Sequence, residues 1–339
     1  KIFNGKIIDI KNNYSSNNTI NKFDKIIFEI NKTNIKLNKG NWKITEPIII
    51  KDKDLIIDKD TILNFSKDSF IYIKGGNLKI NENQSLNNFD AKHTTILRAL
   101  NDDWLGIYVE NENFPETSIL NNVTIKDTKN FNHKTYNLMG GVNFYKSNIL
   151  INNININNSK SEDQINFINS NFEIKNSKFS KSISDSIDSD FSKGIISDST
   201  FEDINGDAID TSGSKVKLKN ISILNVFDKG LSIGEKSQVE GDNIVVKNSG
   251  VGIAIKDSSN LDLNNFSSYD SFIADVLSIN KKNFFGRSYA TIYSSTDINE
   301  NKFIIGNENE IYFNDVLLPT EPIDASALYN SERMKKNAI

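Results

Sequence analysis

The segment KVKLKNISILNVFDKGLSIGEKS (residues 215–237) alternates apolar and polar residues and breaks at Asp, Gly and Ser. The next segment, QVEGDNIVVKNSGVGIAIKDSS (238–259), repeats this pattern. An apolar or aromatic landmark recurs in neighbouring segments at spacings of 23, 22, 22, 23 and 20 residues: Ile156, Phe179, Phe201, Ile223, Val246 and Phe266. Period-two alternation without a helical stripe is typical of short strands separated by polar corners.

A constant period of this length predicts a solenoid. One coil of short strands cannot bury its own apolar side, whereas stacked coils that pair in parallel bury it continuously. An antiparallel sandwich also has short strands, but it does not require a constant period. The segments between strands hold no helical pattern, which argues against an ordinary βαβ sheet. We therefore predict an all-β parallel β-helix with coils of about 20–23 residues.

The same alternation extends over most of the chain. We predict a single β-helix domain over residues 1–318, in which residues 1–39 form atypical capping coils. The last coil runs from Phe303 to Leu318. Residues 319–339 differ in character and are predicted to form a tail, with a short helix from about Ile323.

Composition excludes several classes of function. The 40 basic and 44 acidic residues give a formal charge of −4, which offers no reason to expect a nucleic acid as partner. The absence of cysteine excludes disulfides and thiol chemistry. No apolar run approaches the roughly 20 residues of a membrane span. We attribute the abundant Asn, Ile and Lys to an AT-rich genome, and the beginning KIFNGKIIDI to a mature form or a fragment.

Placing the strands in phase creates a charged stripe. One column of apolar residues should point inward: Ile187, Ile209, Leu231 and Ile253. The residues after them should point outward: Asp188, Asp210, Ser232 and Ala254. Two residues before the apolar column stand Asp185, Asp207, Lys229 and Val251, and the corners after it carry Asp190, Ser212, Glu235, Lys256 and Asp257.

Stacked carboxylates in this stripe should repel one another. Neighbouring strands lie about 4.8 Å apart, so acids on successive coils should raise a pKa or require a cation. Lys229 follows one coil later and should neutralise part of the charge. The alternative is that each acid is only a corner residue, because Asp, Asn, Gly and Ser are all favoured in turns.

With these residues aligned, the sequence resembles the right-handed parallel β-helix proteins of the pectin-lyase-like superfamily. The resemblance covers roughly residues 40–318 and is most specific across 162–287. The order of the motifs SDSIDSD, GDAID, DKGLSIGE and AIKD is similar to that of the polygalacturonases, whose acids on successive coils act as general acid and base. The sequence departs from that family, because Lys229 stands where the histidine of its Gly-His-Gly turn would be, and Ala254 replaces its clamp arginine.

Three kinds of chemistry fit the stripe. Hydrolysis of a glycosidic bond needs two carboxyl groups, and Asp188 with Asp210, or Asp185 with Asp207, could supply them. A lyase needs a base and a cation for a uronate carboxylate, which assigns Lys229 or Lys256. A Ca²⁺ site would use Asp188, Asp190 and Asp210. No cofactor is certain, and the Ca²⁺ site remains an alternative.

The sequence thus leaves two hypotheses open. On the first, a secreted or cell-surface protein binds a polysaccharide and cleaves it with Asp188, Asp207, Asp210 and Lys229. Its substrate contacts would be Asp185, Asp190, Glu235, Lys256, Asp257 and Arg287, the last within the basic segment KKNFFGRSY (281–289). On the second, the chain is a non-catalytic structural or adhesive scaffold. Loops near 126–145 and 281–300 would form the walls of a groove, and the oligomeric state is unknown.

Overall fold

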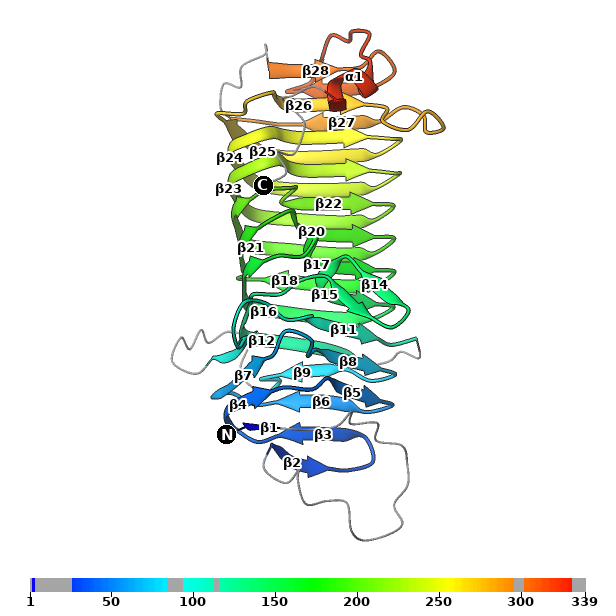
Figure 1. The fold of residues 1–339 in the computed structure, drawn as a ribbon. Helices are drawn as coiled ribbons and strands as arrows, with labels where there is room; N and C mark the ends of the chain where they lie inside the picture. Colours follow the sequence, from blue (N-terminus) through cyan, green and yellow to red (C-terminus); the bar gives the residue numbers. More distant parts are fainter. Residues whose placement is uncertain (1, 4–25, 84–93, 113–115, 296–301, 331–339) are drawn as a thin grey trace. The chain divides into compact units, whose positions relative to one another are not determined.

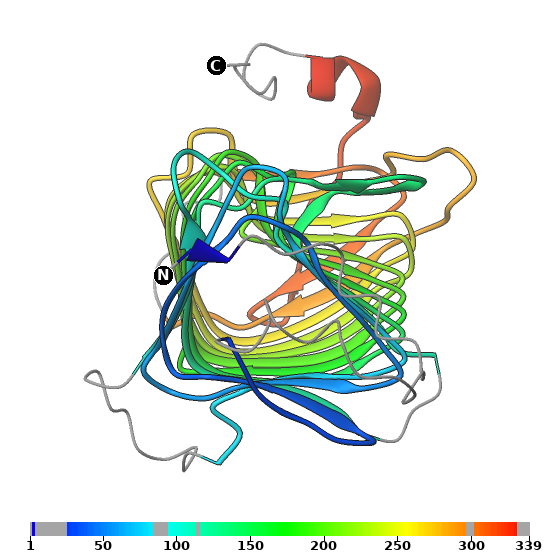
Figure 2. The ribbon, with the colours of Figure 1, turned by 60° about the horizontal axis from the view of Figure 1, so that its bottom comes forward.

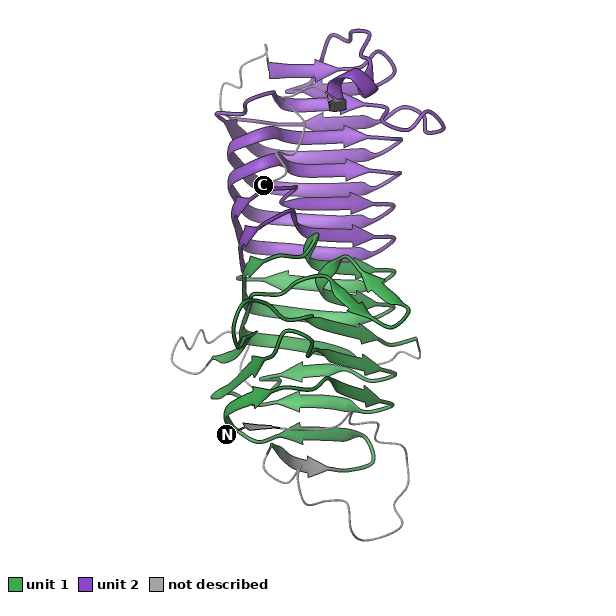
Figure 3. Cartoon of the chain, viewed as in Figure 1, with its two compact units in different colours: residues 1–177 green, residues 178–339 purple. Residues whose placement is uncertain are grey.

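A computed structural model describes residues 2–3, 26–83, 94–112, 116–295 and 302–330 (Figure 1). The structure is 66% strand and 2% helix, with parallel strands stacked in about 11 turns. The chain divides into two compact units, residues 1–177 and 178–339 (Figure 3). The predicted parallel β-helix is confirmed in each unit, whereas the single domain over 1–318 stays a prediction.

Every full coil passes through three strand positions, which we call faces A, B and C. In unit 1, face A comprises β5 (Ile48–Lys51), β8 (Ile71–Lys74), β11 (Ile107–Glu110), β15 (Gly140–Tyr145) and β17 (Asp163–Ile168). Face B comprises β3 (Asn34–Leu37), β6 (Asp54–Ile57), β9 (Leu78–Ile80), the first halves of β12 (Thr117–Lys126) and β16 (Asn148–Ser159), and β18 (Asn171–Lys175). Face C comprises β1 (Ile2–Phe3), β4 (Gly40–Ile44), β7 (Thr61–Phe65), β10 (Thr95–Ala99) and the second halves of β12 and β16.

Unit 2 repeats the three faces with longer strands, because several run around a corner without a break. Face A comprises β20 (Asp185–Asp190), β22 (Ile209–Ser212), the ends of β23 (Lys215–Gly234) and β24 (Gln238–Lys256), β26 (Ala274–Ile279) and β28 (Phe303–Ile305). Face B comprises the starts of β21 (Lys193–Ile204), β23, β24 and β25 (Asn260–Tyr269), then β27 (Tyr289–Ile292) and β29 (Glu310–Phe313). Face C comprises β19 (Lys178–Ser182) and the later parts of β21, β23, β24 and β25. Figure 2 looks more nearly along the stack and shows the coils of unit 2, green to orange, behind one another.

The register on face A of unit 2 is the one that the alternation predicts. Ile187 pairs with Ile209, Ile209 with Leu231, and Leu231 with Ile253. All of these side chains are buried. On face C, Phe179, Phe201, Ile223 and Val246 also align as expected. Phe266 does not, because it pairs with Ile244 rather than Val246; the spacing of 20 residues reflects this mismatch and not a shorter coil.

Stacked aromatic rings run along the core of each unit. Phe179 and Phe201 lie with their ring centroids 5.1 Å apart and their planes 7° from parallel in unit 2. Phe144 and Phe167 stack in the same way in unit 1, at 5.9 Å. All four rings are fully buried, so each coil covers the apolar side chain of the coil before it.

Asparagine and aspartate hold the corners of the coils. In unit 2 the corner between faces B and C carries one residue with positive φ on each coil: Asp198, Asn220, Asn243 and Asn265. The Asn220 amide donates to the Asp198 carboxylate over 2.7 Å, and the Asn243 amide donates to Asn220 over 2.9 Å. These side chains tolerate the left-handed conformation and bond locally. Asparagine therefore has a structural role at these corners.

Face B carries one antiparallel strand in each unit. In unit 1 it pairs with the first strand of the face, and in unit 2 with the last. In unit 1, β2 (Ile27–Ile30) pairs antiparallel with β3. In unit 2, β30 (Val316–Leu317) turns back on β29. Most of the predicted cap at 1–39 lies outside the described residues, since 4–25 are not described.

The segment after the last coil of unit 2 contains a short helix, α1 (Ala325–Asn330), in the region 319–339 where the sequence indicated one. Ile323, Ala325 and Leu328 pack against the outer side of face A, on an apolar cluster that includes Ala254 and Leu277. In the portion of the chain that the structure describes, no helix is long and apolar enough to cross a membrane.

Candidate functional site

Two carboxylates stand side by side on the outer side of face A in unit 2. Asp188 of β20 pairs in register with Asp210 of β22, and both side chains are half-buried. The same column continues with Ser232 and Ala254, which are buried. The predicted outward column is therefore present, and its polar part spans adjacent strands about 4.8 Å apart.

A buried ion pair lies beside this column. The Lys229 ammonium is 3.0 Å from Asp207 Oδ1 and 2.7 Å from Asp228 Oδ2. The Lys229 backbone N–H also donates to Asp207 Oδ1, over 3.1 Å. Asp207 and Lys229 are only 5% and 4% exposed. Lys229 thus neutralises Asp207 on the coil before it and Asp228 next to it.

The environment of Asp207 favours its ionised form. Burial alone would raise the pKa of Asp207, but the ammonium groups of Lys229 and Lys256 and hydrogen bonds from Lys229 and Ser232 outweigh it. The net result is an Asp207 pKa below its usual value, as expected for a carboxylate with cationic neighbours.

Asp185 completes a group of three carboxylates. Its Oδ1 accepts the Asp207 backbone N–H over 2.8 Å. One oxygen of Asp185, one of Asp207 and one of Asp210 lie within 4.8 Å of one another. This group differs from the expected Ca²⁺ ligands Asp188, Asp190 and Asp210, because Asp190 pairs with Ser212 at the far end of β20. The Lys229 ammonium contacts both oxygens of Asp207, so it supplies the positive charge that a cation would bring.

Two further lysines lie near the group. The Lys256 ammonium is buried and donates to Ser232 Oγ over 2.8 Å. Lys281 follows β26, and it interacts electrostatically with four groups: Lys256, Lys229, Asp210 and Asp207. Desolvation first, and then repulsion from Lys256 and Lys229, lowers the pKa of Lys281, although part of its side chain stays exposed. We call the residues Asp185, Asp188, Asp207, Asp210, Lys229, Lys256 and Lys281 the acid–lysine cluster.

The loop that carries Lys281 is fastened to the coils before it. The Lys282 backbone N–H donates to Asp257 Oδ1 over 2.8 Å, and the Lys282 ammonium bonds Glu235. Gly286 N donates to Ser258 Oγ over 2.7 Å. We predicted that Glu235 and Asp257 contact a substrate. In the structure they hold the loop that carries Lys281.

Of two further predicted residues, Arg287 lies beside a face B strand, apart from the acid–lysine cluster, and Asp190 stands at the end of β20, two residues after Asp188. Arg287 pairs with Glu310 over 2.9 Å, at the start of a face B strand, and its side chain is 64% exposed. The Asp190 backbone carbonyl accepts a hydrogen bond from Ser192 Oγ at the corner after β20. Sequence reasoning placed Lys281 only in a basic segment; its position two residues after the strand end was the one available signal.

The second expected wall, near 126–145, belongs to unit 1. There β13 (Phe131–His133) and β14 (Tyr136–Leu138) form a hairpin over the outer side of face A. The hairpin packs on Tyr72 and Tyr108, whose rings stack at 5.1 Å, and Tyr72 donates to Glu110 over 2.9 Å. This hairpin covers an aromatic surface of its own unit.

Comparison with known proteins finds likeness in structure alone. No protein-family model and no curated protein matches the sequence. Tailspike protein 2 of an Escherichia coli O157:H7 bacteriophage aligns with a TM-score of 0.47 and 10% identity, over 81% of this chain and 42% of the tailspike. The periplasmic alginate epimerase AlgG aligns with a TM-score of 0.41 and 12% identity, over 86% and 79%. The catalytic domain of a GH87 α-1,3-glucanase aligns with a TM-score of 0.38 and 12% identity, over 77% and 64%.

Proposed function

We propose that the acid–lysine cluster binds an acidic polysaccharide and cleaves it by β-elimination. The observation that carries the proposal is the ion pair of Lys229 with Asp207, beside which Lys256 bonds Ser232 and Lys281 lies within electrostatic range of Asp207 and Asp210. A surface with both signs of charge can hold the carboxylate of a uronic acid and also move a proton. We further propose that the protein is secreted or displayed at a cell surface, where such polymers occur.

Lys281 is the base in this proposal. A general base works best when its pKa lies near the working pH, and the pKa of Lys281 is already lowered by desolvation and its cationic neighbours. The neutral Lys281 amine takes the proton from the carbon next to the uronate carboxylate. The electron pair forms a carbon–carbon double bond, the glycosidic C–O bond at the next carbon breaks, and the departing oxygen takes a proton from solvent.

The remaining residues hold the charges in place. Lys256 is buried beside Ser232, so it would not touch the substrate but would add positive charge beneath the substrate carboxylate, whose negative charge increases as the proton leaves. Lys229 is a positioning residue, since its ammonium is enclosed by Asp207 and Asp228. Asp210 would accept hydrogen bonds from sugar hydroxyls.

Hydrolysis by Asp188 and Asp210 is the second candidate. Their pairing on adjacent strands supports it, because retaining glycosidases hold two carboxyl groups about 5–5.5 Å apart. Hydrolysis, however, works through two carboxyl groups and gives Lys281 no part in the reaction. Elimination fits the lysine-rich surroundings better.

The deciding experiment measures products from galacturonan, alginate and a neutral glucan. Ultraviolet absorbance of unsaturated ends reports elimination, and reducing ends without absorbance report hydrolysis. Lys281→Arg keeps the charge but removes the base, so it should abolish absorbance, while Lys217→Met, which breaks an exposed ion pair with Glu240 on face B, should not. The rate of elimination should rise with pH through a pKa below the usual lysine value of about 10.4.

Other outcomes separate the alternatives. Reducing ends that persist in Lys281→Arg and vanish in Asp210→Asn would establish hydrolysis instead. Binding without any product, for all three polymers, would contradict cleavage and identify a non-catalytic adhesive protein.

A further inference from the structure

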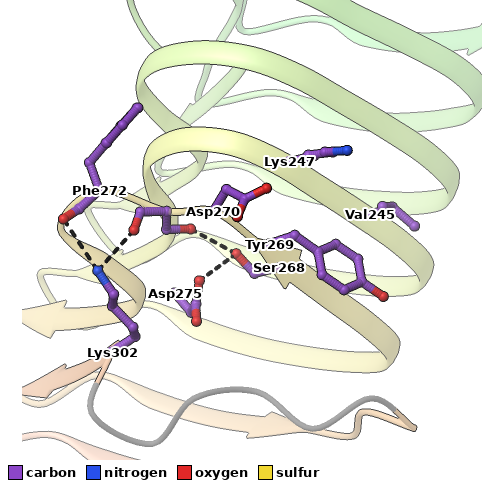
Figure 4. A pocket seen from close by; sticks show the side chains of 9 residues that line it. Val245, Lys247, Ser268, Tyr269, Asp270, Phe272, Asp275 and Lys302 are labelled. Carbon is purple, nitrogen blue, oxygen red and sulfur yellow. Dashed lines mark hydrogen bonds between the residues drawn. The ribbon is translucent and has the colours of Figure 1, made fainter.

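A hollow of about 860 Å³ lies in unit 2 where the coils turn from face C to face A (Figure 4). The end of β25 and the turn before β26 form most of its wall, with Tyr269, Phe272 and Asp275 among the lining residues. Lys247 of β24 and Lys302 also line it. None of these residues belongs to the acid–lysine cluster.

A buried carboxylate forms part of the wall. Asp275 is only 5% exposed, and its Oδ1 accepts a hydrogen bond from Ser268 Oγ over 2.8 Å. The Ser268 hydroxyl is also 2.9 Å from the Ser271 hydroxyl. Within the described ranges, no lysine or arginine forms an ion pair with Asp275. An ionised carboxylate has room for about four hydrogen bonds, so Asp275 keeps capacity for donors from a ligand.

The rim supplies an aromatic ring and positive charge. Tyr269 is 41% exposed, and Lys247 pairs with it in register on the neighbouring strand. The Lys302 ammonium donates to the backbone carbonyls of Ser271 and Phe272, at 3.0 and 3.4 Å, and so fixes the turn (Figure 4). The ring, the ammonium of Lys247 and the deeper carboxylate thus belong to one hollow, whose turn is held in place by Lys302.

We propose that this hollow binds one sugar unit of an acidic glycan. The Tyr269 ring would pack against the C–H face of the sugar, as aromatic rings do with partly apolar ligands. Asp275 would accept hydrogen bonds from sugar hydroxyls, and Lys247 would pair with an anionic substituent. A purely apolar ligand would cover the buried Asp275 carboxylate without adding a donor to the one that Ser268 supplies, which is costly.

The hollow lies a short distance along the stack from Lys229 of the acid–lysine cluster. Lys229 pairs in register with Val251, and Val251 pairs with Ala274, the neighbour of Asp275. Two coil spacings of about 4.8 Å separate these strands, or roughly 10 Å along the stack. The direct path between the two places is covered, because Ile323 and Leu328 pack on the apolar cluster that includes Val251 and Ala274. An oligosaccharide would have to pass beside that segment to contact both places, whereas a monosaccharide would fill the hollow alone.

The test follows the methyl signals of Val245, which lines the hollow, by NMR during titration with oligogalacturonate, galacturonic acid and a neutral glucan oligomer. Oligogalacturonate should shift these signals most strongly. Asp275→Asn should weaken this binding about tenfold or more, because it replaces hydrogen bonds to a charged acceptor. Tyr269→Ala should weaken it several-fold, while Tyr289→Ala, at an exposed tyrosine on face B, should leave it unchanged.

The two proposals fail separately. If neither the wild type nor Lys281→Arg makes a product, but both show the Val245 shift, the proposal of a sugar site in the hollow stands and the proposal of cleavage is rejected. If the Asp275→Asn variant does not fold, the affinity of Tyr269→Ala, a change at an exposed side chain, tests the sugar site instead. Unshifted Val245 signals at saturating oligogalacturonate, or equal affinity of the wild type and Tyr269→Ala, would overturn the sugar site.

Discussion

Asp207 and Lys229 stabilise the fold only as a pair. Both are almost fully buried, and Lys229 also contacts Asp228. Removing one member of a buried pair leaves the other charge without compensation, which typically costs about 3–5 kcal/mol. A neutral pair avoids this cost.

We therefore expect Asp207→Asn to lower the free energy of unfolding by no more than about 3–5 kcal/mol at neutral pH, because the Lys229 ammonium keeps its contact with Asp228. The double variant Asp207→Asn/Lys229→Met should recover much of this loss, because no unpaired ammonium remains at that position. Chemical denaturation of the two single variants and the double variant measures the coupling. Strictly additive losses would show that the two groups do not interact.

The same pair predicts a pH dependence. Because the pKa of Asp207 is lower in the folded protein, its carboxylate stabilises the fold above the unfolded value of about 3.9. That contribution is lost as the pH falls through the folded pKa. The difference in unfolding free energy between wild type and Asp207→Asn should be constant from about pH 6 to 8 and should shrink below about pH 4. A difference that grows in acid would contradict the assignment.

Corner residues act at the scale of the strand and its turn. Asn220 has a φ of 54° and bonds both Asp198 and Asn243. Asn220→Ala should cost about 1–2 kcal/mol, because alanine resists the left-handed conformation. Asn220→Gly should cost less, since glycine adopts it freely. Asn205→Ala, at an exposed asparagine outside the positive-φ ladders, is the control, and an equal loss there would refute the argument.

The aromatic stack gives a second prediction for the strands. Phe201→Ala should lower the free energy of unfolding by about 3–5 kcal/mol, because it leaves a cavity beneath the Phe179 ring. Phe191→Ala, at a side chain that is 68% exposed, should change it by no more than about 0.5 kcal/mol. Urea unfolding of both variants compares the two positions. Similar losses would mean that stacking in the core contributes little.

Local patterns determined what could be predicted at this scale. Alternation gave the register of Ile187, Ile209, Leu231 and Ile253, because a shift of one residue would expose every apolar side chain. Lys281 could not be placed, since its loop has no period and depends on contacts of Lys282 with Glu235 and Asp257. The alternation also showed that Asp207 and Lys229 share a column, but not that both are buried.

At the scale of the molecule, unit 2 is a stack in which each coil contacts its neighbours in sequence. The stability of such a stack is close to a sum over neighbouring coils. Native-state hydrogen exchange should therefore be slowest in β23 and β24, which pair with a coil on both sides, and faster in β28, a strand of Phe303–Ile305. Equal protection of β28 and β23 would instead indicate a single all-or-none opening.

The antiparallel strands β2 and β30 have a consequence for self-association. A stack of parallel coils can in principle grow without limit, because each terminal strand offers its free edge to another chain. Here β30 runs against β29 and occupies the edge that a following coil would use, and β2 does the same to β3. A coil of another chain would meet a strand of reversed direction there and could not continue the parallel ladder of hydrogen bonds. Two reversed strands of two and four residues thus protect the face B edge at the first strand of unit 1 and at the last strand of unit 2 from parallel pairing with another chain.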